Sequence, residues 1–394
     1  MVFKVKYSFS ILKLTILFLY SCVEPFDAET GTFESVIIIE ATLTDEMKTQ
    51  QITLTRASPL EGDATVAESN AQVSIIDDSK NEYVFRETAP GVYTSANEFA
   101  AQPNQGYQLF VTTNNGRSYV SSSSRLTIQD TDEIDELYAE RTNDTGNEGI
   151  SIFIDNVGIG ANTAYYRYEY EETYKVIAPF WTQNDLVETP PGSSQLDLVI
   201  KDQEERTCFR TELSNTITVA NTNAFTENRL ARFPIRFIDK DSYILANRYS
   251  ILVKQFVVSR DAFTFYETLR DFSGSESLFS ENQPGFFAGN IVSETDADEK
   301  VVGFFDVSAV SSKRIFFEHP DFFPDGPLPD FVNDCLQDAP RYDTLLDLVR
   351  SDFVRYLREN SDPEPFEGPY IVVADICGDC TVFGSNVVPD FWEE

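Results

Sequence analysis

Residues 165–170 read YYRYEY, and the fold can be deduced outward from this alternation. Successive side chains of a β-strand point to opposite faces, so Tyr166, Tyr168 and Tyr170 share one face, and the arginine and glutamate between them share the other. One aromatic face and one charged face predict a half-buried strand. Runs of strand-forming residues recur on both sides of this stretch. We therefore predict a mainly β protein.

Residues 34–128 carry short alternating runs separated by turns, with no helical stripe between them. Turn signals such as Pro90-Gly91 and Asn114-Asn115-Gly116 recur at roughly the 8–12-residue spacing of a β-sandwich. We predict one N-terminal β-sandwich over 34–128. Its expected strands include Ser35–Ala41, Gln51–Thr55, Gln72–Ile76, Tyr83–Arg86, Tyr107–Thr112 and Ser118–Ser121.

Residues 129–318 resume the strand pattern after a joint rich in serine and aspartate, and they predict a second β-sandwich of the Ig or fibronectin type. A helix is expected as an insertion at 261–272, because Ala262, Phe265, Tyr266 and Leu269 follow the i, i+3, i+4, i+7 spacing. Further expected strands include Leu196–Ile200, Pro234–Ile238, Tyr249–Val258, Val301–Val307 and Lys313–Phe317.

Residues 319–394 form a C-terminal extension that opens with a loop rich in Pro, Asp and Phe. An apolar stripe from Tyr342 through Val349 to Leu357 predicts a helix over 342–359, with Arg355 and Arg358 in a last turn where cations suit the helix dipole. A strand-like run, a CxxC sequence and the terminal PDFWEE follow.

Four cysteines lie in the second half of the chain: Cys208, Cys335, Cys377 and Cys380. In an exported protein this even number predicts two disulfides, with three connectivities open. Cys377 and Cys380 form the CxxC, for which zinc or a redox dithiol are the alternatives. The chain has no second CxxC and no flanking histidine, so we favour structural disulfides that tie down the C-terminal extension.

The N-terminus reads as an export signal. Residues 11–22, ILKLTILFLYSC, form an apolar run preceded by Lys4 and Lys6 and too short for the roughly 20 residues of a membrane span. The run ends on Cys22, and Leu19 and Ser21 before it resemble a bacterial lipobox, whose cysteine is lipidated. We predict a signal peptide over 1–21 and a lipid-anchored tether over 22–33. An ordinary signal peptide with a chance cysteine is the alternative.

The formal net charge of −35 restricts the partners. Such a surface repels nucleic acid and anionic headgroups, so no nucleic-acid partner is expected and membrane contact would come through the lipid. Asp130-Thr131-Asp132 and Asp296-Ala297-Asp298 offer oxygens of the kind calcium prefers, but neither has EF-hand spacing. We predict solvated acids, no metal, and no cofactor besides the lipid on Cys22.

The sequence contains few residues in patterns typical of catalytic sites. His319 is the one histidine, it lies beside a proline, and no GxSxG surrounds a serine. We expect no catalytic residues and no enzyme activity; a surface hydrolase using a carboxylate pair is the rival, since composition alone excludes no such pair. Phe322, Phe323 and Phe331 lie in loop context and are candidates for a partner interface, with packing over the sandwich edge as the alternative.

These features together resemble a lipoprotein family of the Bacteroidota, domain of unknown function 4249. The resemblance rests on Cys22, on AQVSIIDD at 71–78 and on three later stretches. Those stretches are YSILVKQFVVSRDAFTFYETL (249–269), SLFSENQPGFFAGNI (277–291) and VVGFFDVSAVSSKRIFF (301–317). Cys377-x-x-Cys380 followed by PDFW at 389–392 is similar to the closing signature of the family.

The resemblance implies an outer-membrane lipoprotein that works beside a β-barrel transporter of the TonB-dependent type. Glu24 and Asp27 resemble the acidic tag that sends such lipoproteins to the cell surface. We expect a binding or accessory subunit whose ligand or nutrient is unknown. A structural subunit of a larger outer-membrane machine, with no ligand of its own, is the alternative.

Overall fold

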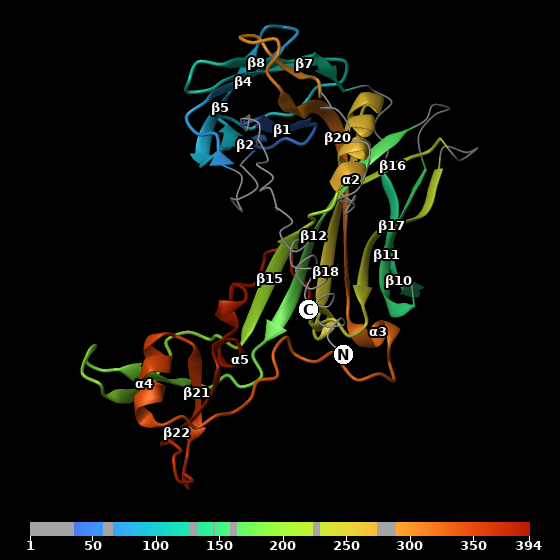
Figure 1. Cartoon of the computed structure of the whole chain (residues 1–394). Helices are drawn as coiled ribbons and strands as arrows, with labels where there is room; N and C mark the ends of the chain where they lie inside the picture. The colour runs from blue at the N-terminus through green and yellow to red at the C-terminus, as the bar shows by residue number, and fades with distance from the viewer. Residues whose placement is uncertain are drawn as a thin grey trace, which may run out of the picture.

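The computed structural model describes residues 35–57, 66–126, 133–144, 146–157, 164–223, 229–273 and 289–394. These residues form a mainly β protein, as predicted, with its elements arranged in three lobes (Figure 1). We call them the N-terminal, central and C-terminal lobes. The predicted signal peptide, the tether, Cys22, Glu24 and Asp27 lie outside the described residues, as does the Asp130–Asp132 stretch.

The N-terminal lobe is built on one curled sheet. Its strands follow the order β1-β2-β6-β5-β4-β7-β8-β19, with β3 beside β2 and β9 beside β7. The side-chain amide of Asn290, next to β19, links the last strand of this order to the strand that pairs with β1. It donates to the carbonyl of Phe305 (2.8 Å) and accepts from the N–H of Phe305 (2.7 Å). The strands are β1 (Ile37–Thr44), β2 (Gln51–Arg56), β3 (Val66–Ala67), β4 (Gln72–Asp77), β5 (Glu82–Ala89), β6 (Val92–Ser95), β7 (Gly106–Thr112), β8 (Ser118–Ser121), β9 (Ser124–Arg125) and β19 (Ile291–Ser293).

The central lobe places two sheets face to face. One holds β15-β12-β18 with β16 beside β12, and the other holds β10-β11-β17. Its elements are β10 (Ile134–Asp144), β11 (Asn147–Val157), β12 (Tyr165–Ile177), β15 (Thr207–Leu213), β16 (Thr218–Asn221), β17 (Arg229–Asp239), η1 (Tyr243–Leu245), β18 (Tyr249–Val257), α2 (Arg260–Ser273) and α3 (His319–Phe322). Helix α2 confirms the predicted insertion at 261–272.

The tyrosine face of β12 is the core of this lobe, as its alternation predicts. Tyr166, Tyr168 and Tyr170 are at most 9% exposed. Polar groups also join the two sheets: the carboxylate of Glu172 on β12 accepts from the hydroxyl of Tyr249 (2.7 Å) and from Nε of Arg236 on β17 (3.2 Å). A buried carboxylate needs such partners, since burying an unpaired charge is strongly unfavourable.

One strand is shared by the N-terminal and central lobes. β20 (Val301–Phe317) is 17 residues long. Its first half, 301–308, pairs in parallel with β1, and its second half, 309–317, pairs antiparallel with β18. The expected strands Val301–Val307 and Lys313–Phe317 are therefore one strand. The first of them pairs with the N-terminal lobe, not within a unit spanning 129–318.

Asp306 lies on β20 just before the point where the pairing changes from β1 to β18. Its carboxylate is 2% exposed and accepts hydrogen bonds from the hydroxyls of Ser124 (3.3 Å), Ser259 (3.2 Å) and Ser308 (3.1 Å). Burial raises the pKa of Asp306, although these bonds oppose the rise. Ser124 belongs to the N-terminal lobe and Ser259 precedes α2 in the central lobe, so one side chain ties both lobes to β20.

The C-terminal lobe combines the tail with a hairpin from the middle of the chain (Figure 1). Its elements are β13 (Asn184–Glu188), β14 (Leu196–Ile200), α4 (Tyr342–Arg350), β21 (Val354–Glu359), β22 (Tyr370–Ala374), α5 (Asp375–Gly378) and η2 (Cys380–Val382). Helix α4 packs on the hairpin, and β21 pairs with β22.

The predicted helix over 342–359 is wrong beyond residue 350. Helix α4 ends at Arg350, Asp352 adopts a positive φ of 60°, and β21 follows. The apolar spacing also fits a strand over the last six residues, where Val354 and Tyr356 share one face. The backbone of β22 satisfies their hydrogen bonds, and this pairing decides between the two structures.

Candidate functional site

Two disulfides hold the C-terminal lobe together. Cys335 bonds to Cys377, and Cys208 on β15 bonds to Cys380, which anchors the tail to the sheet of the central lobe. All four sulfurs are on buried residues. The two cysteines of the CxxC thus have different, distant partners. This confirms the expected disulfides and fixes their connectivity, and it does not fit a redox dithiol formed by the CxxC itself.

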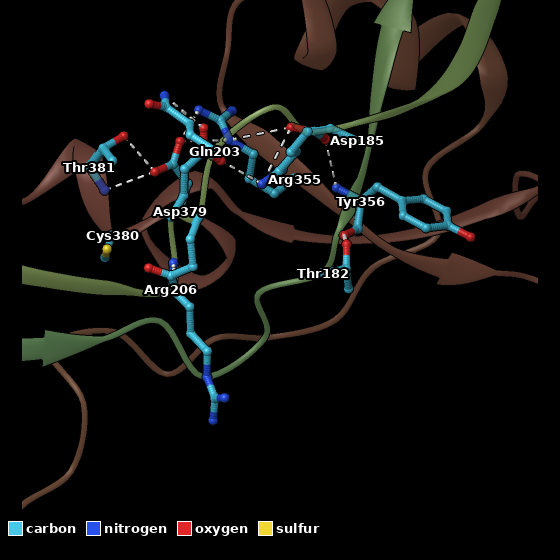
Figure 2. A network of polar contacts seen from close by, with 12 residues as sticks. Thr182, Asp185, Gln203, Arg206, Arg355, Tyr356, Asp379, Cys380 and Thr381 are labelled. Atoms are coloured by element: carbon cyan, nitrogen blue, oxygen red, sulfur yellow. Dashed lines mark hydrogen bonds and ion pairs between the residues drawn. The ribbon is translucent and has the colours of Figure 1, made fainter. Parts of the chain in front are cut away.

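A buried arginine links the hairpin to the tail (Figure 2). Arg355 on β21 is 8% exposed; its Nε and Nη2 lie 3.3 and 3.1 Å from a carboxylate oxygen of Asp379, and its Nε lies 3.7 Å from Asp185. The other oxygen of Asp379 accepts from the backbone N–H (2.8 Å) and hydroxyl (2.6 Å) of Thr381. The network joins β13, β21 and the CxxC.

The surroundings of Asp379 favour the ionised form of its carboxyl. Its burial by itself would raise the pKa of the carboxyl, but the hydrogen bonds from Thr381 and the Arg355 guanidinium lower the pKa below its ordinary value. Both side chains of the pair are buried, so the pair is part of the interior of the lobe.

The surface of this lobe is unusually apolar. Among the described residues, twelve of the seventeen exposed large hydrophobic side chains belong to the hairpin or to the tail. Ile200 is 72% exposed, Leu336 79% and Phe353 64%. Leu328, Val387 and Val388 are on tail segments that pack on the central lobe. The other nine are on or beside the elements of the C-terminal lobe, and exposed apolar side chains, which are common singly, are in this concentration typical of an interaction surface. These nine are Leu198, Val199, Ile200, Val332, Leu336, Tyr342, Phe353, Phe366 and Val382.

The three phenylalanines predicted for a partner interface occupy other surroundings. Phe323 is 7% exposed, stacks on His319 at 4.8 Å between ring centroids, and has the guanidinium of Arg141 4.7 Å from its ring. Phe322 and Phe331 are half-buried and pack against the core. The interface prediction is wrong for Phe323, whose ring covers the end of the central lobe, the alternative that the sequence left open.

The remaining sequence candidates are placed as follows. His319 is 3% exposed, and burial lowers its pKa. Asp296 accepts from the N–H of Asp298 (3.1 Å) within a local turn. Within the described ranges, no group of three His, Cys, Asp or Glu side chains is placed to hold a metal ion. In the same part of the chain, no helix is long and apolar enough to cross a membrane.

A cleft at the meeting of the N-terminal and central lobes was not predicted. It has a volume of about 600 Å³, and Glu40 on β1, Arg167 on β12 and Tyr266 on α2 lie around it. The sequence signal was the charged face of YYRYEY, since Arg167 and Glu169 both line the cleft. Nothing in the local pattern indicated that this face meets a strand located about 130 residues earlier in the chain.

Comparison with known proteins identifies the family. The model of "Domain of unknown function (DUF4249)" matches residues 23–314. The chain belongs to this family. No curated protein matches the sequence.

Among solved structures, the chain is similar to a DUF4785 family protein from Legionella pneumophila. The identity is 8%, the TM-score is 0.16, and the match covers 55% of this chain and 50% of the other. The match thus spans about half of each protein, and a likeness of this size carries no argument about function.

Proposed function

We propose that this DUF4249 protein is a lipid-anchored, non-enzymatic accessory subunit of an outer-membrane complex. In this proposal Cys22 carries the lipid, the acidic tether with Glu24 and Asp27 directs the body to the cell surface, and the source is a member of the Bacteroidota. The partner is a β-barrel of the TonB-dependent type. The finer fold that we propose is two β-sandwich units of the Ig or fibronectin kind joined along β20.

The observation that carries the proposal is the surface of the C-terminal lobe. Its exposed apolar side chains lie on a lobe whose core is small and whose geometry is fixed by two disulfides. A rigid surface loses little conformational entropy when it binds, so a crosslinked lobe suits docking to another protein. Apolar side chains that are left in water on such a lobe are best explained by a partner that covers them.

A pull-down from native membranes tests the proposal. The protein with a C-terminal tag is extracted in mild detergent, and the co-purifying proteins are identified. A TonB-dependent barrel recovered in stoichiometric amount supports the accessory role. Other outer-membrane proteins recovered without such a barrel would instead support the structural-subunit alternative. Recovery of the protein alone would contradict both.

Point variants then locate the surface. Ile200→Ser and Leu336→Ser each remove an exposed apolar side chain from the C-terminal lobe, and we expect several-fold lower recovery of the partner. Val84→Ser is the matched control, because Val84 is 48% exposed on β5 of the N-terminal lobe. Equal recovery with all three variants would show that the C-terminal lobe is not the docking surface.

A further inference from the structure

The cleft between the N-terminal and central lobes has the form of a ligand site. Its volume of about 600 Å³ lies within the range usual for small-molecule sites, roughly 300–1,000 Å³. One wall is the outward face of β1 and β2, and the other is formed by α2, β12 and β18. The joint at Asp306 holds the two walls in fixed relation, so the cleft is preformed.

The wall beside α2 is apolar. Phe265 and Leu269 of α2 and Ile217 before β16 line it, and Phe256 and Phe304 extend the same cluster beneath. On the opposite wall Ile38 adds a half-buried aliphatic side chain. Such surfaces favour a ligand with an apolar body, because covering them removes apolar area from water.

The two cations of the cleft already have anionic partners. Arg167 forms an ion pair with Glu169, and its guanidinium also lies 4.2 Å from the ring centroid of Phe256 and 5.0 Å from that of Tyr266. Lys48 forms an ion pair with Glu46. Both cations are ion-paired within the protein, which weakens their attraction for an anionic ligand, although Nε of Arg167 has no hydrogen-bond partner among the described residues.

Glu40 is the exception. Its side chain is exposed in the cleft, between Thr53 of β2 and Phe304 of β20 in the sheet register. The carboxylate itself makes no hydrogen bond or ion pair with any other residue that the structure describes. A free carboxylate beside an aromatic cluster is the group that a cationic head would contact. The chain's net charge of −35 adds an overall field that attracts cations.

We propose that this cleft binds a small organic cation, with its ammonium group at Glu40 and its apolar body against Ile38, Ile217 and Leu269. The site is independent of the docking surface on the C-terminal lobe and does not rest on the accessory role. The recognition is electrostatic at one end and hydrophobic at the other, which is the usual division in small-molecule sites.

Matched probes test the charge requirement. Phenethylamine, 2-phenylethanol and 3-phenylpropionate share an aromatic body and differ in head group: cation, neutral alcohol and anion. Binding to the purified full chain is measured by calorimetry at low salt and again at high salt. We expect phenethylamine to bind, to bind at least about tenfold more tightly than the alcohol, and to weaken with salt. Equal affinity for amine and alcohol, or no binding of the amine, would overturn the proposal.

Variants test the location. Glu40→Gln keeps the size and removes the charge, and it should weaken phenethylamine about tenfold while leaving 2-phenylethanol unchanged. Gln51→Trp, on an exposed position that lines the cleft, should block both probes. Glu82→Gln is the control, because Glu82 is an exposed strand glutamate outside the cleft. Unchanged binding in Glu40→Gln, or an equal loss in Glu82→Gln, would refute the site.

A lysine tripeptide separates a free cation from a protein side chain. Its ammonium group and aliphatic stem offer similar chemistry on a larger body. If the peptide binds and phenethylamine does not, the cleft takes a segment of a protein partner and the small-molecule proposal fails. If phenethylamine binds more tightly than the peptide, the small-molecule proposal holds.

Discussion

The N-terminal and C-terminal lobes solve the same problem, holding a small β structure together, in different ways. The N-terminal lobe has no cysteine between residues 35 and 126, and its curled sheet encloses aliphatic and tyrosine side chains such as Leu54, Tyr93 and Leu109, all fully buried. The C-terminal lobe has small core clusters, two disulfides and a buried arginine network.

The difference follows from size. A lobe with few residues buries a smaller fraction of its surface, and the hydrophobic gain is then too small to offset the loss of conformational entropy. Crosslinks lower the entropy of the unfolded chain, and this contributes the stability that the small core does not provide. Cys208–Cys380 does this across 172 residues of sequence, and Cys335–Cys377 across 42. The two lobes should therefore respond to opposite perturbations.

Loss of the disulfides should have the largest effect. Reduction, or the double change Cys335→Ser with Cys208→Ser, removes about 2–5 kcal/mol of stability per bond. We expect backbone amides of α4, β21 and β22 to lose protection in hydrogen exchange while those of β1, β2 and β7 keep it. Equal loss of protection in both lobes would contradict the conclusion that the disulfides stabilise mainly the C-terminal lobe.

The substitution Arg355→Ala should cause the next largest loss of stability. It leaves the buried carboxylate of Asp379 without its cation, and breaking a buried pair in this way destabilises by about 3–5 kcal/mol. The loss should again appear in the C-terminal lobe, measured by hydrogen exchange under oxidising conditions. Arg86→Ala on β5, an exposed arginine of the N-terminal lobe, is the control and should change little.

The substitution Leu109→Ala tests the N-terminal lobe. Leu109 is fully buried on β7, and truncation should destabilise the N-terminal lobe by about 3 kcal/mol through lost transfer energy and a cavity. Thermal unfolding followed by tyrosine fluorescence measures it. The effect should be the same with and without reductant; a reductant-dependent effect would mean that the disulfides also support this lobe.

The smallest expected effect is the dependence of stability on pH that comes from Asp379. Because the folded-state pKa of Asp379 is lowered, its contribution to stability is fully present above the pKa of the unfolded chain, roughly 3.9, and is lost as pH falls through the lower folded value. We expect the C-terminal lobe to loosen in that window. Asp379→Asn should flatten the pH dependence of stability below about pH 4. An unchanged slope would assign the acid sensitivity to other groups.

The local patterns predicted much of this molecule. Period-two alternation identified the tyrosine face of β12, and the apolar spacing at Ala262, Phe265 and Leu269 identified α2. Both succeed because one element's burial leaves its own period in the sequence. The pattern failed at residues 354–359, since a short apolar run fits both periods and the partner strand lies beyond it in the chain.

The candidate site was predicted less well for the same reason. For the loop phenylalanines the sequence left a partner interface and packing over the sandwich edge both open, and Phe323 is covered by Arg141 from a strand about 180 residues earlier. The cleft depends on Glu40, Arg167 and Tyr266, which no local pattern connects.

The sequence by itself determined the fold class, the even set of cysteines, the acidic character and the family, because composition and local periodicity record burial and charge directly. Only the tertiary structure decided which cysteines pair, that β20 is shared by two lobes, and which charged groups meet in the cleft. These depend on long-range strand pairing, where the register between distant segments is set by packing of the whole molecule and leaves no periodic trace in either segment.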